Sequence, residues 1–210
     1  TGLRDVITGS IHLGSEDITH ATPRDVHRAG VAHIPEDRQR AGLVGDFSVA
    51  ENMVLTRYHD DGFSTGIKMD WPKARAVAAD LVEQYDVRTP SIQTAAGNLS
   101  GGNQQKVIVA RELSRDLELV IASQPTRGVD VGSIEYIHSQ VVKARDEGAA
   151  VLVVSTELDE VMALSDRVIV MYRGRIVANL RRDETEHNDI GLYMAGAKEQ
   201  PVKTDAETTS

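Results

Sequence analysis

The chain has 210 residues, of which 40% are hydrophobic and 26% charged, and its formal net charge is -9. This composition predicts one ordinary globular domain with a buried core. The acidic excess argues against nucleic acid as a main partner, because binding to a phosphate backbone depends on Lys and Arg patches. The apolar runs are too short to cross a bilayer, and the absence of cysteine excludes disulfides and thiolate metal sites.

The beginning of the chain predicts short elements. Residues 10–18 predict a β-ribbon that turns at Gly14 and Ser15, and a short helix follows with Pro23 at its first position. The apolar run over 30–35 predicts a strand, which proline ends.

The middle of the chain, from Val49 onward, predicts helices. Asp70 is expected to cap a helix that continues through Tyr85, because apolar residues recur there at helical spacing and Pro72 lies in the first turn. Trp71 is interpreted as a packing residue and not as a platform for base stacking.

The segment Asn-Leu-Ser-Gly-Gly-Asn-Gln-Gln-Lys over 98–106 is the most informative. Good helix formers follow it, so a helix is expected to begin at Ser100, Gly101 and Gly102. The first amides of a helix lack intrahelical partners and favour an anion such as a nucleotide γ-phosphate. Glycines allow close approach of that anion to the backbone, although two glycines beside a helix are by themselves more typical of a plain turn.

The second half of the chain alternates between strand and helix. Residues 117–122 and 150–155 predict buried strands, and the helix over 133–146 between them stops at Gly148. Such a βαβ unit places its two strands side by side in a parallel sheet. Beyond it we expect a helix over 158–164.

The end of the chain predicts a hairpin with strands over 167–172 and 175–180. The arginines in and after it are interpreted as solvated; they are Arg173, Arg175, Arg181 and Arg182. Residues 198–210 are acidic and rich in threonine, which predicts a disordered tail after a domain over 1–197.

Residues 98–106 resemble the LSGGQ signature of ATP-binding-cassette (ABC) ATPases, with Asn103 where the family usually has Gln. Other segments match the family in the same order, over about residues 1–196. They are 31–36 at the Q-loop, 123–126 at the Walker B end, 128–130 at the D-loop and 155–160 at the switch histidine. The resemblance implies an α/β fold of the P-loop NTPase type, with a parallel-sheet core, a helical subdomain over about 49–115 and an antiparallel β-ribbon.

Within the family, three strings are similar to the second cassette of fused tandem ATPases from ribose, galactose and nucleoside importers. They are Pro-Glu-Asp-Arg at 35–38, Asn-Gln-Gln-Lys at 103–106 and Thr-Arg-Gly-Val-Asp-Val-Gly at 126–132. The family's phosphate loop, GxxxxGK[ST] or Walker A, does not occur in this sequence. We therefore interpret the chain, which begins at Thr1, as a cassette truncated before residue 1.

Four positions depart from the family pattern. Ser123 stands where the family has the Walker B Asp that orders Mg²⁺, and Gln124 stands where it has the Glu that polarises water. Thr156 replaces the switch histidine, and Glu36 replaces the Q-loop glutamine. Each change alone has an ordinary explanation, such as loop variation or a solvated charge. Together they indicate a degenerate site that supplies no competent catalytic residue and no metal ligand of its own.

The signature is intact at Ser100, Gly101, Gly102 and Gln104. ABC dimers sandwich each ATP and its Mg²⁺ between one cassette's phosphate loop and the other's signature. The resemblance therefore implies that this chain lends its signature to a site completed by a partner cassette, which is expected on the same polypeptide. Asp130 of the D-loop is expected to act across that interface.

The leading hypothesis is the ATP-binding subunit of an importer for nucleosides or simple sugars, peripheral on the cytoplasmic face of the plasma membrane. Permease subunits, and indirectly a solute-binding protein, are the implied partners. The chain alone is expected to be inactive as an ATPase. Two alternatives stay open: a soluble tandem ABC protein that acts on ribosomes or DNA-repair complexes, and a non-catalytic regulatory cassette. His33 and His138 lack ligand spacing and are interpreted as ordinary histidines, so no metal site is predicted.

Overall fold

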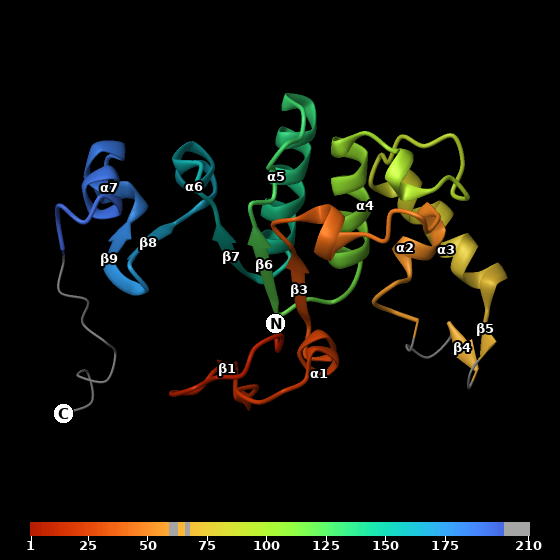
Figure 1. Ribbon diagram of the computed structural model, residues 1–210, viewed down its shortest axis with the longest axis horizontal. Helices are drawn as coiled ribbons and strands as arrows, with labels where there is room; N and C mark the ends of the chain where they lie inside the picture. Colours follow the sequence, from red (N-terminus) through yellow and green to blue (C-terminus); the bar gives the residue numbers. More distant parts are fainter. Residues whose placement is uncertain (59–62, 66–67, 200–210) are drawn as a thin grey trace. The chain divides into compact units, whose positions relative to one another are not determined.

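A computed structural model of the chain describes residues 1–58, 63–65 and 68–199 (Figure 1). The chain divides into two compact units, one over Thr1–Val154 and a second that begins at Ser155. Almost all of the predicted disordered tail lies outside the described residues. The prediction of a domain over 1–197 stays a prediction.

The first unit combines a parallel sheet with several helices and two small ribbons. Its elements are β1 (His12–Leu13), β2 (Glu16–Asp17), α1 (Pro23–Arg28), β3 (Val31–Ile34), the π-helical turn η1 (Arg38–Gly42), α2 (Val49–Met53), β4 (Ser64–Thr65), β5 (Lys68–Met69), α3 (Trp71–Gln84), the 3-10 turn η2 (Ala96–Asn98), α4 (Gly101–Leu113), β6 (Leu119–Ser123), α5 (Val131–Asp146) and β7 (Ala150–Val154).

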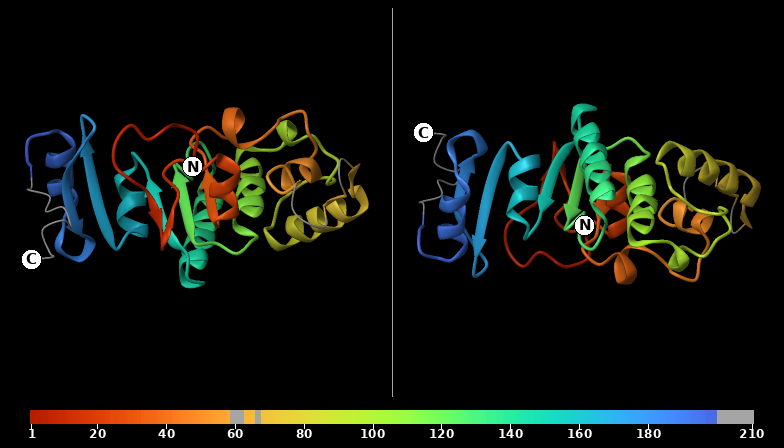
Figure 2. Two further views of the ribbon diagram at one scale, coloured as in Figure 1. Left: turned by 90° about the horizontal axis from the view of Figure 1, so that it is seen from below. Right: turned by 90° about the horizontal axis from the view of Figure 1, so that it is seen from above.

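The sheet of this unit has the order β3-β6-β7, and both pairs are parallel. Ile34 pairs with Ala122, and Ser123 pairs with Val154, so the three strands end at one edge. Helix α5 packs on the sheet, where Ala144 joins Val120 in a buried cluster (Figure 2). The βαβ unit predicted from the sequence is therefore confirmed, but β7 is not buried as predicted, since Leu152 and Val154 of this edge strand are about half exposed.

Capping residues explain where the helices of the first unit begin. A short polar side chain at the N-cap accepts a hydrogen bond from an amide that has no partner within the helix. The first unit uses this device at Thr22 for α1, Ser48 for α2, Asp70 for α3, Ser100 for α4 and Asp130 for α5. The starts predicted for α3 and α4 are thus confirmed, and α5 begins two residues before the predicted start.

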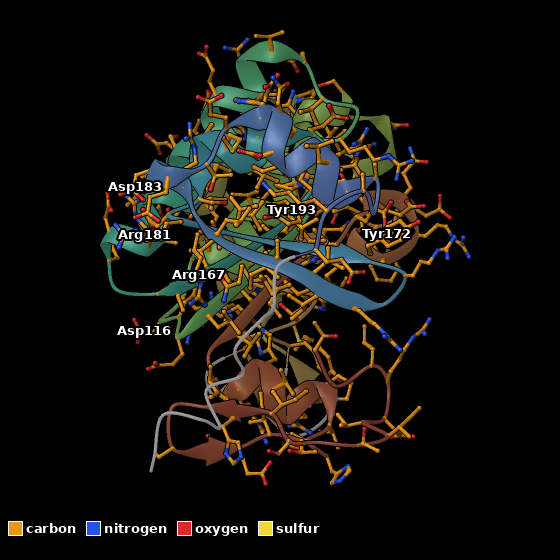
Figure 3. All side chains as sticks on the ribbon, turned by 90° about the vertical axis from the view of Figure 1, so that its left-hand side faces the viewer. Asp116, Arg167, Tyr172, Arg181, Asp183 and Tyr193 are labelled. Atoms are coloured by element: carbon orange, nitrogen blue, oxygen red, sulfur yellow. The ribbon has the colours of Figure 1, made fainter. Side chains whose placement is uncertain are left out.

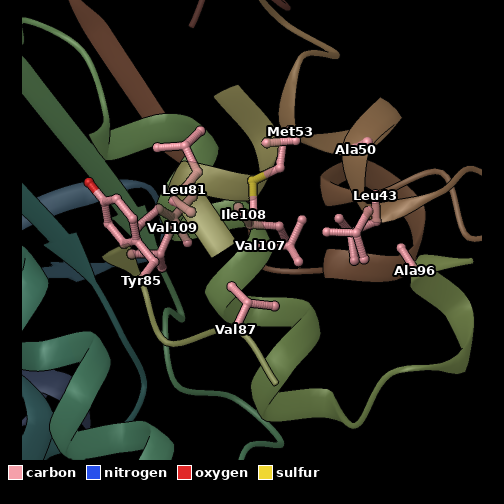
Figure 4. Packing of buried hydrophobic residues seen from close by; sticks show 14 of the residues in the cluster. Leu43, Ala50, Met53, Leu81, Tyr85, Val87, Ala96, Val107, Ile108 and Val109 are labelled. Carbon is pink, nitrogen blue, oxygen red and sulfur yellow. The ribbon is translucent and has the colours of Figure 1, made fainter. Parts of the chain in front are cut away.

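Helix α4 lies at the centre of the first unit, between β3 on one side and α2 and α3 on the other (Figure 1). Its residues Val107 and Ile108 are fully buried and pack in one cluster with Met53 of α2 and Leu81 of α3 (Figure 4). Burial of such side chains contributes about 1.5–3 kcal/mol each. The packing fixes the direction of α4, and with it the position of its N-terminus.

A buried ion pair on α4 joins this helix to the elements around it. Arg111 Nε donates to Glu112 Oε1 at 2.8 Å, and both side chains are about 5% exposed. Arg111 also donates to the carbonyl oxygen of Gly42 at 2.9 Å, and Glu112 Oε2 accepts the His33 amide at 3.3 Å. One charged pair therefore links β3, η1 and α4.

His33 gives the stability of this region a pH dependence. Burial lowers the pKa of His33 below its ordinary value of 6.5, and the Glu112 charge opposes that change. Below about pH 6.5 the unfolded chain then binds more protons than the folded chain, so stability falls as the pH decreases.

When the pH is lowered from 7.5 to 5.5, we expect the free energy of unfolding to fall less in His33→Gln than in the wild type. Urea unfolding followed by the fluorescence of Trp71, the single tryptophan, measures this in the first unit. Substitution of the exposed His12 is the control. Equal losses in His33→Gln and the wild type would contradict the assignment.

The second unit is built on an antiparallel hairpin. Its elements are α6 (Leu158–Leu164), β8 (Arg167–Tyr172), β9 (Arg175–Arg181), the 3-10 turn η3 (Arg182–Glu184) and α7 (His187–Met194). Tyr193 of α7 packs with Val168 and Val170 of the hairpin, and Tyr172 borders this cluster (Figure 3). The exposed Arg181 pairs with Asp183 at 2.9 Å, as expected of a solvated arginine.

Several elements were not expected from the sequence. Helix α2 is only five residues long, the β4–β5 ribbon interrupts the helical middle, and η1 and α7 were not predicted.

In the described part of the chain, no helix has the length and apolarity needed to cross a membrane. In the same part, no group of three or more His, Asp or Glu side chains is arranged to hold a metal ion.

Candidate functional site

The segment around Ser100 forms the exposed N-terminus of α4. Ser100 Oγ accepts hydrogen bonds from the Asn103 amide at 3.4 Å and from Asn103 Nδ2 at 2.9 Å. The first intrahelical bond runs from the Gln104 amide to the Ser100 carbonyl oxygen at 2.9 Å. The amides of Gly101 and Gly102 precede that bond, so the positive end of the helix dipole lies beside the exposed Ser100 hydroxyl, with Gly101 half-buried and Gly102 buried.

The two glycines of this segment are required by contacts within the protein. A Cβ at Gly101 would lie 2.7 Å from Arg38 Nη2 and 3.0 Å from the Gly128 carbonyl oxygen. A Cβ at Gly102 would overlap Ser133 Oγ and lie 2.6 Å from Asp130 Oδ2. We expected the glycines to allow an anion to approach, and the structure adds a second reason for them, because the chain's own atoms fill the positions that side chains would need.

Gln104 is buried and bridges two segments. Its Oε1 accepts from Arg38 Nε at 3.3 Å, and its Nε2 donates to the carbonyl oxygens of Ala96 at 3.2 Å and Gly97 at 3.4 Å. This side chain therefore lies inside the protein, beneath the exposed Ser100.

Lys106 is the last residue of the segment 98–106, and it contacts Asp86 and Tyr136. Its Nζ lies 2.6 Å from Asp86 Oδ2 and 4.4 Å from the centre of the Tyr136 ring. The hydrogen bond and charge of Lys106 lower the pKa of Asp86. The contacts hold α4 between the end of α3 and the face of α5.

The ends of β3 and β6 bring together three of the predicted positions. Ile34 of β3 pairs with Ala122 of β6. Glu36 comes two residues after Ile34, and Gln124 comes two residues after Ala122, so both lie at the same edge of the sheet. Ser123 is the last residue of β6. Gln124 has a φ of 50° and its amide donates to the Val154 carbonyl oxygen at 2.7 Å. A left-handed backbone at a glutamine is uncommon and is a feature often found at functional sites.

Glu36 forms an ion pair with an arginine. Its Oε1 lies 2.5 Å from Arg127 Nη1, and both side chains are more than half exposed. The Glu36 carboxylate is therefore paired with a positive charge from the segment that follows β6.

Asp130 caps α5 and lies next to the signature of its own chain. Its carboxylate accepts from the Ser133 amide at 3.0 Å and from Ser133 Oγ at 2.8 Å. These hydrogen bonds lower the pKa of Asp130, which keeps it ionised. Thus the N-termini of α4 and α5 meet at Gly102.

Thr156 belongs to the second unit, two residues beyond β7. The other predicted site residues, at 36, 100–102, 104, 123–124 and 130, all belong to the first unit. His33 on β3 and His138 on α5 lie on different elements.

Two residues of this region were not singled out from the sequence. Arg38 and Arg127 link the segment after β3 to the segment after β6. The sequence did point to both arginines, because they belong to strings that resemble the family. Arg38 ends the string Pro-Glu-Asp-Arg, and Arg127 lies within the string at 126–132. A single sequence does not reveal that these two strings meet in space.

The sequence is similar to known import ATP-binding proteins. The ABC transporter family model matches residues 1–127. The guanosine import ATP-binding protein NupO of Bacillus subtilis (strain 168) is 45% identical over 200 residues, which cover 95% of this chain and 39% of that protein. The nucleoside import ATP-binding protein NupA of Lactococcus lactis subsp. cremoris (strain MG1363) is 47% identical over 196 residues, 93% of this chain and 39% of that protein. The chain thus spans about two fifths of the length of these relatives.

Solved structures have the same fold. The dimeric structure of a post-hydrolysis state of the ATP-binding cassette MJ0796, bound to ADP and Pi, matches with a TM-score of 0.70 at 21% identity. The match covers 86% of this chain and 76% of that one. The expected α/β cassette fold, with a parallel sheet and antiparallel strands, is therefore confirmed. By its family match, its relatives and its fold, the chain belongs to the ABC transporter family.

Proposed function

We propose that the chain is an ATP-binding cassette of an importer and lends its signature to a nucleotide site that a partner cassette completes. The observation that supports this most is the contrast between two parts of the first unit. The signature presents the exposed Ser100 hydroxyl and the first amides of α4, whereas β6 ends in Ser123 and Gln124, which carry no carboxylate.

The N-terminus of α4 has the properties that bind a phosphate group. ATP held there would supply the γ-phosphoryl group, whose transfer spreads negative charge over its oxygens. The exposed Ser100 hydroxyl and the Gly101 amide are the donors at this end of α4, and donors held in place stabilise such charge with little reorganisation. Asn103 Nδ2 donates to Ser100 Oγ, so this hydroxyl is left with its own hydrogen to donate to a phosphate oxygen.

The end of β6 lacks the chemistry of a hydrolytic site of its own. Mg²⁺ prefers carboxylate oxygens and water, and Ser123 and Gln124 offer a hydroxyl and an amide. Glu36, the carboxylate at this edge, is paired with Arg127. These residues do not fit a Mg²⁺ site. Gln124 also cannot accept a proton from water, and loss of a general base typically costs about 10²- to 10⁴-fold in rate.

The proposed solute class is nucleosides or simple sugars. It is supported by the names of NupO and NupA, which are import proteins for guanosine and for nucleosides. Because these relatives are much longer than the chain, we also propose that it is the second cassette of a tandem protein whose Walker A segment precedes residue 1.

The proposed partners follow from that assignment. They are a second cassette on the same polypeptide, permease subunits and, through them, a solute-binding protein. The cassette would lie on the cytoplasmic face of the membrane, where the helices within about 49–115 contact the permease. We include in this proposal that residues of about 49–115 form a helical subdomain. We also include that Thr156, in place of the switch histidine, contributes to the degenerate site of this chain.

Ser100→Arg tests the proposal in the transporter assembled with its partner cassette and permease. The bulky cation would occupy the phosphate position, so we expect ATPase activity and transport to fall at least about 10²-fold. Ser100→Asp is the sharper variant, because Asp caps a helix as well as Ser does but repels phosphate. We expect it to lose activity while the fold keeps its stability.

Ser139→Arg on the exposed side of α5 is the matched control and should keep wild-type activity. The isolated chain is a second control, for which we expect no appreciable ATPase activity. Full activity of both Ser100 variants would refute the signature role and favour a regulatory cassette. Recovery of the protein with polysomes, and not with a permease, would favour the soluble class.

A further inference from the structure

The guanidinium of Arg38 contacts two separate segments of the first unit at once. Its Nη1 donates to the Arg127 carbonyl oxygen at 2.7 Å and its Nη2 to the Gly128 carbonyl oxygen at 3.1 Å. Its Nε donates to Gln104 Oε1 at 3.3 Å. The planar fork of an arginine fixes the relative positions of three such acceptors, which a lysine ammonium cannot do.

The position of Arg38 is itself fixed. It is the first residue of η1, and Asp37 caps this turn by accepting from the amides of Gln39 and Arg40, each at 3.0 Å. The guanidinium then fills the space beside Gly101, where a Cβ would be 2.7 Å from Nη2. A side chain at position 101 would therefore displace the Arg38 guanidinium from its place.

A second link joins the same two segments in the opposite direction. Arg38 donates to the backbone of residue 127, and the side chain of Arg127 pairs with Glu36. The segment after β3 and the segment after β6 are thus connected twice.

Gln104 extends the connection. Its Oε1 accepts from Arg38, while its Nε2 donates to the carbonyl oxygens of Ala96 and Gly97. A continuous set of hydrogen bonds therefore joins residues 127–128, Arg38, Gln104 and the turn that precedes the signature.

We propose that Arg38 is a positioning residue that holds the signature, Ser100–Gly102, in a fixed relation to the segment 127–130. Arg38 lies behind the glycines and acts through Gln104 and the backbone, not through the nucleotide. It keeps the amides of α4 and the Asp130 cap of α5 in the arrangement in which both meet the partner cassette. This inference rests on the proposed function for its catalytic consequence, but the structural link can be tested in the isolated chain.

Hydrogen exchange of the chain tests the link directly. In Arg38→Gln we expect the amides in peptides covering 98–106 and 126–132 to exchange about tenfold faster, because both segments lose charge-assisted hydrogen bonds. Arg40→Gln is the matched control, since it removes an exposed arginine from the same turn, and it should leave both peptides unchanged. Arg38→Lys should fail to restore protection. Unchanged exchange in Arg38→Gln, or full protection in Arg38→Lys, would overturn the proposal.

ATPase kinetics of the assembled transporter test the consequence. A signature contact that is made only as the site closes affects kcat more than KM. We expect Arg38→Gln to lower kcat about tenfold and to change the KM for ATP less than about twofold. Normal kcat in Arg38→Gln, with Ser100→Arg inactive, would overturn the positioning role alone. Normal activity in Ser100→Arg would refute the proposed function, and hydrogen exchange would still decide whether Arg38 holds the two segments together.

Discussion

Replacement of Arg111 by methionine is expected to lower the free energy of unfolding of the first unit by about 3–5 kcal/mol. The substitution keeps an unbranched apolar stem but leaves Glu112, which is about 5% exposed, without its cation. It also removes the donor to the Gly42 carbonyl oxygen. A buried charge without a partner is among the most costly changes in a protein interior.

Arg145→Met is the matched control. Arg145 pairs with the next residue, Asp146, as Arg111 does with Glu112, but both side chains are about half exposed. Exposed pairs contribute about 0–1 kcal/mol, so this variant should unfold almost as the wild type does. The double variant Arg111→Met with Glu112→Leu should recover part of the loss, because no buried charge remains.

Urea unfolding monitored by Trp71 fluorescence measures these differences, since Trp71 belongs to the first unit. Equal stability of Arg111→Met and Arg145→Met would contradict the argument that burial makes the first pair important.

Gly102→Ala is expected to destabilise the first unit by about 1–3 kcal/mol. Alanine is ordinarily the better helix former, so propensity alone predicts the opposite sign. The new methyl group, however, would overlap Ser133 Oγ and approach Asp130 Oδ2 to 2.6 Å. The N-termini of α4 and α5 would have to separate. We therefore also expect the assembled transporter to lose ATPase activity with this variant.

Gly132→Ala is the control for Gly102→Ala. Gly132 occupies the first turn of α5, and a Cβ there would meet its nearest neighbour, Asp130 Oδ1, at an ordinary 3.5 Å. This variant should be as stable as the wild type or more stable by up to about 1 kcal/mol. The same urea experiment compares the two. A Gly102→Ala protein that is as stable as Gly132→Ala would show that the two helices separate without cost.

Much of the fold followed from local patterns. Caps at Asp70 and Ser100 and the stop at Gly148 marked helix ends, because the hydrogen bonds that end a helix involve neighbouring residues. The βαβ unit was predictable because the handedness of its crossover leaves one arrangement. By contrast, the β4–β5 ribbon and α7 are short elements whose stability comes from tertiary packing, which the local sequence does not encode.

The family resemblance, the order of the motifs and the side chains at 36, 123, 124 and 156 could all be recognised in the amino-acid sequence. The surroundings of these side chains became known from the folded chain. Glu36 is paired with Arg127, and Arg38 connects the signature to residues 127–128. Local patterns could not predict these contacts, because they join residues that are 66 to 91 positions apart in the chain. Such contacts form only when α4 is packed against the sheet, and local propensities carry no information about them.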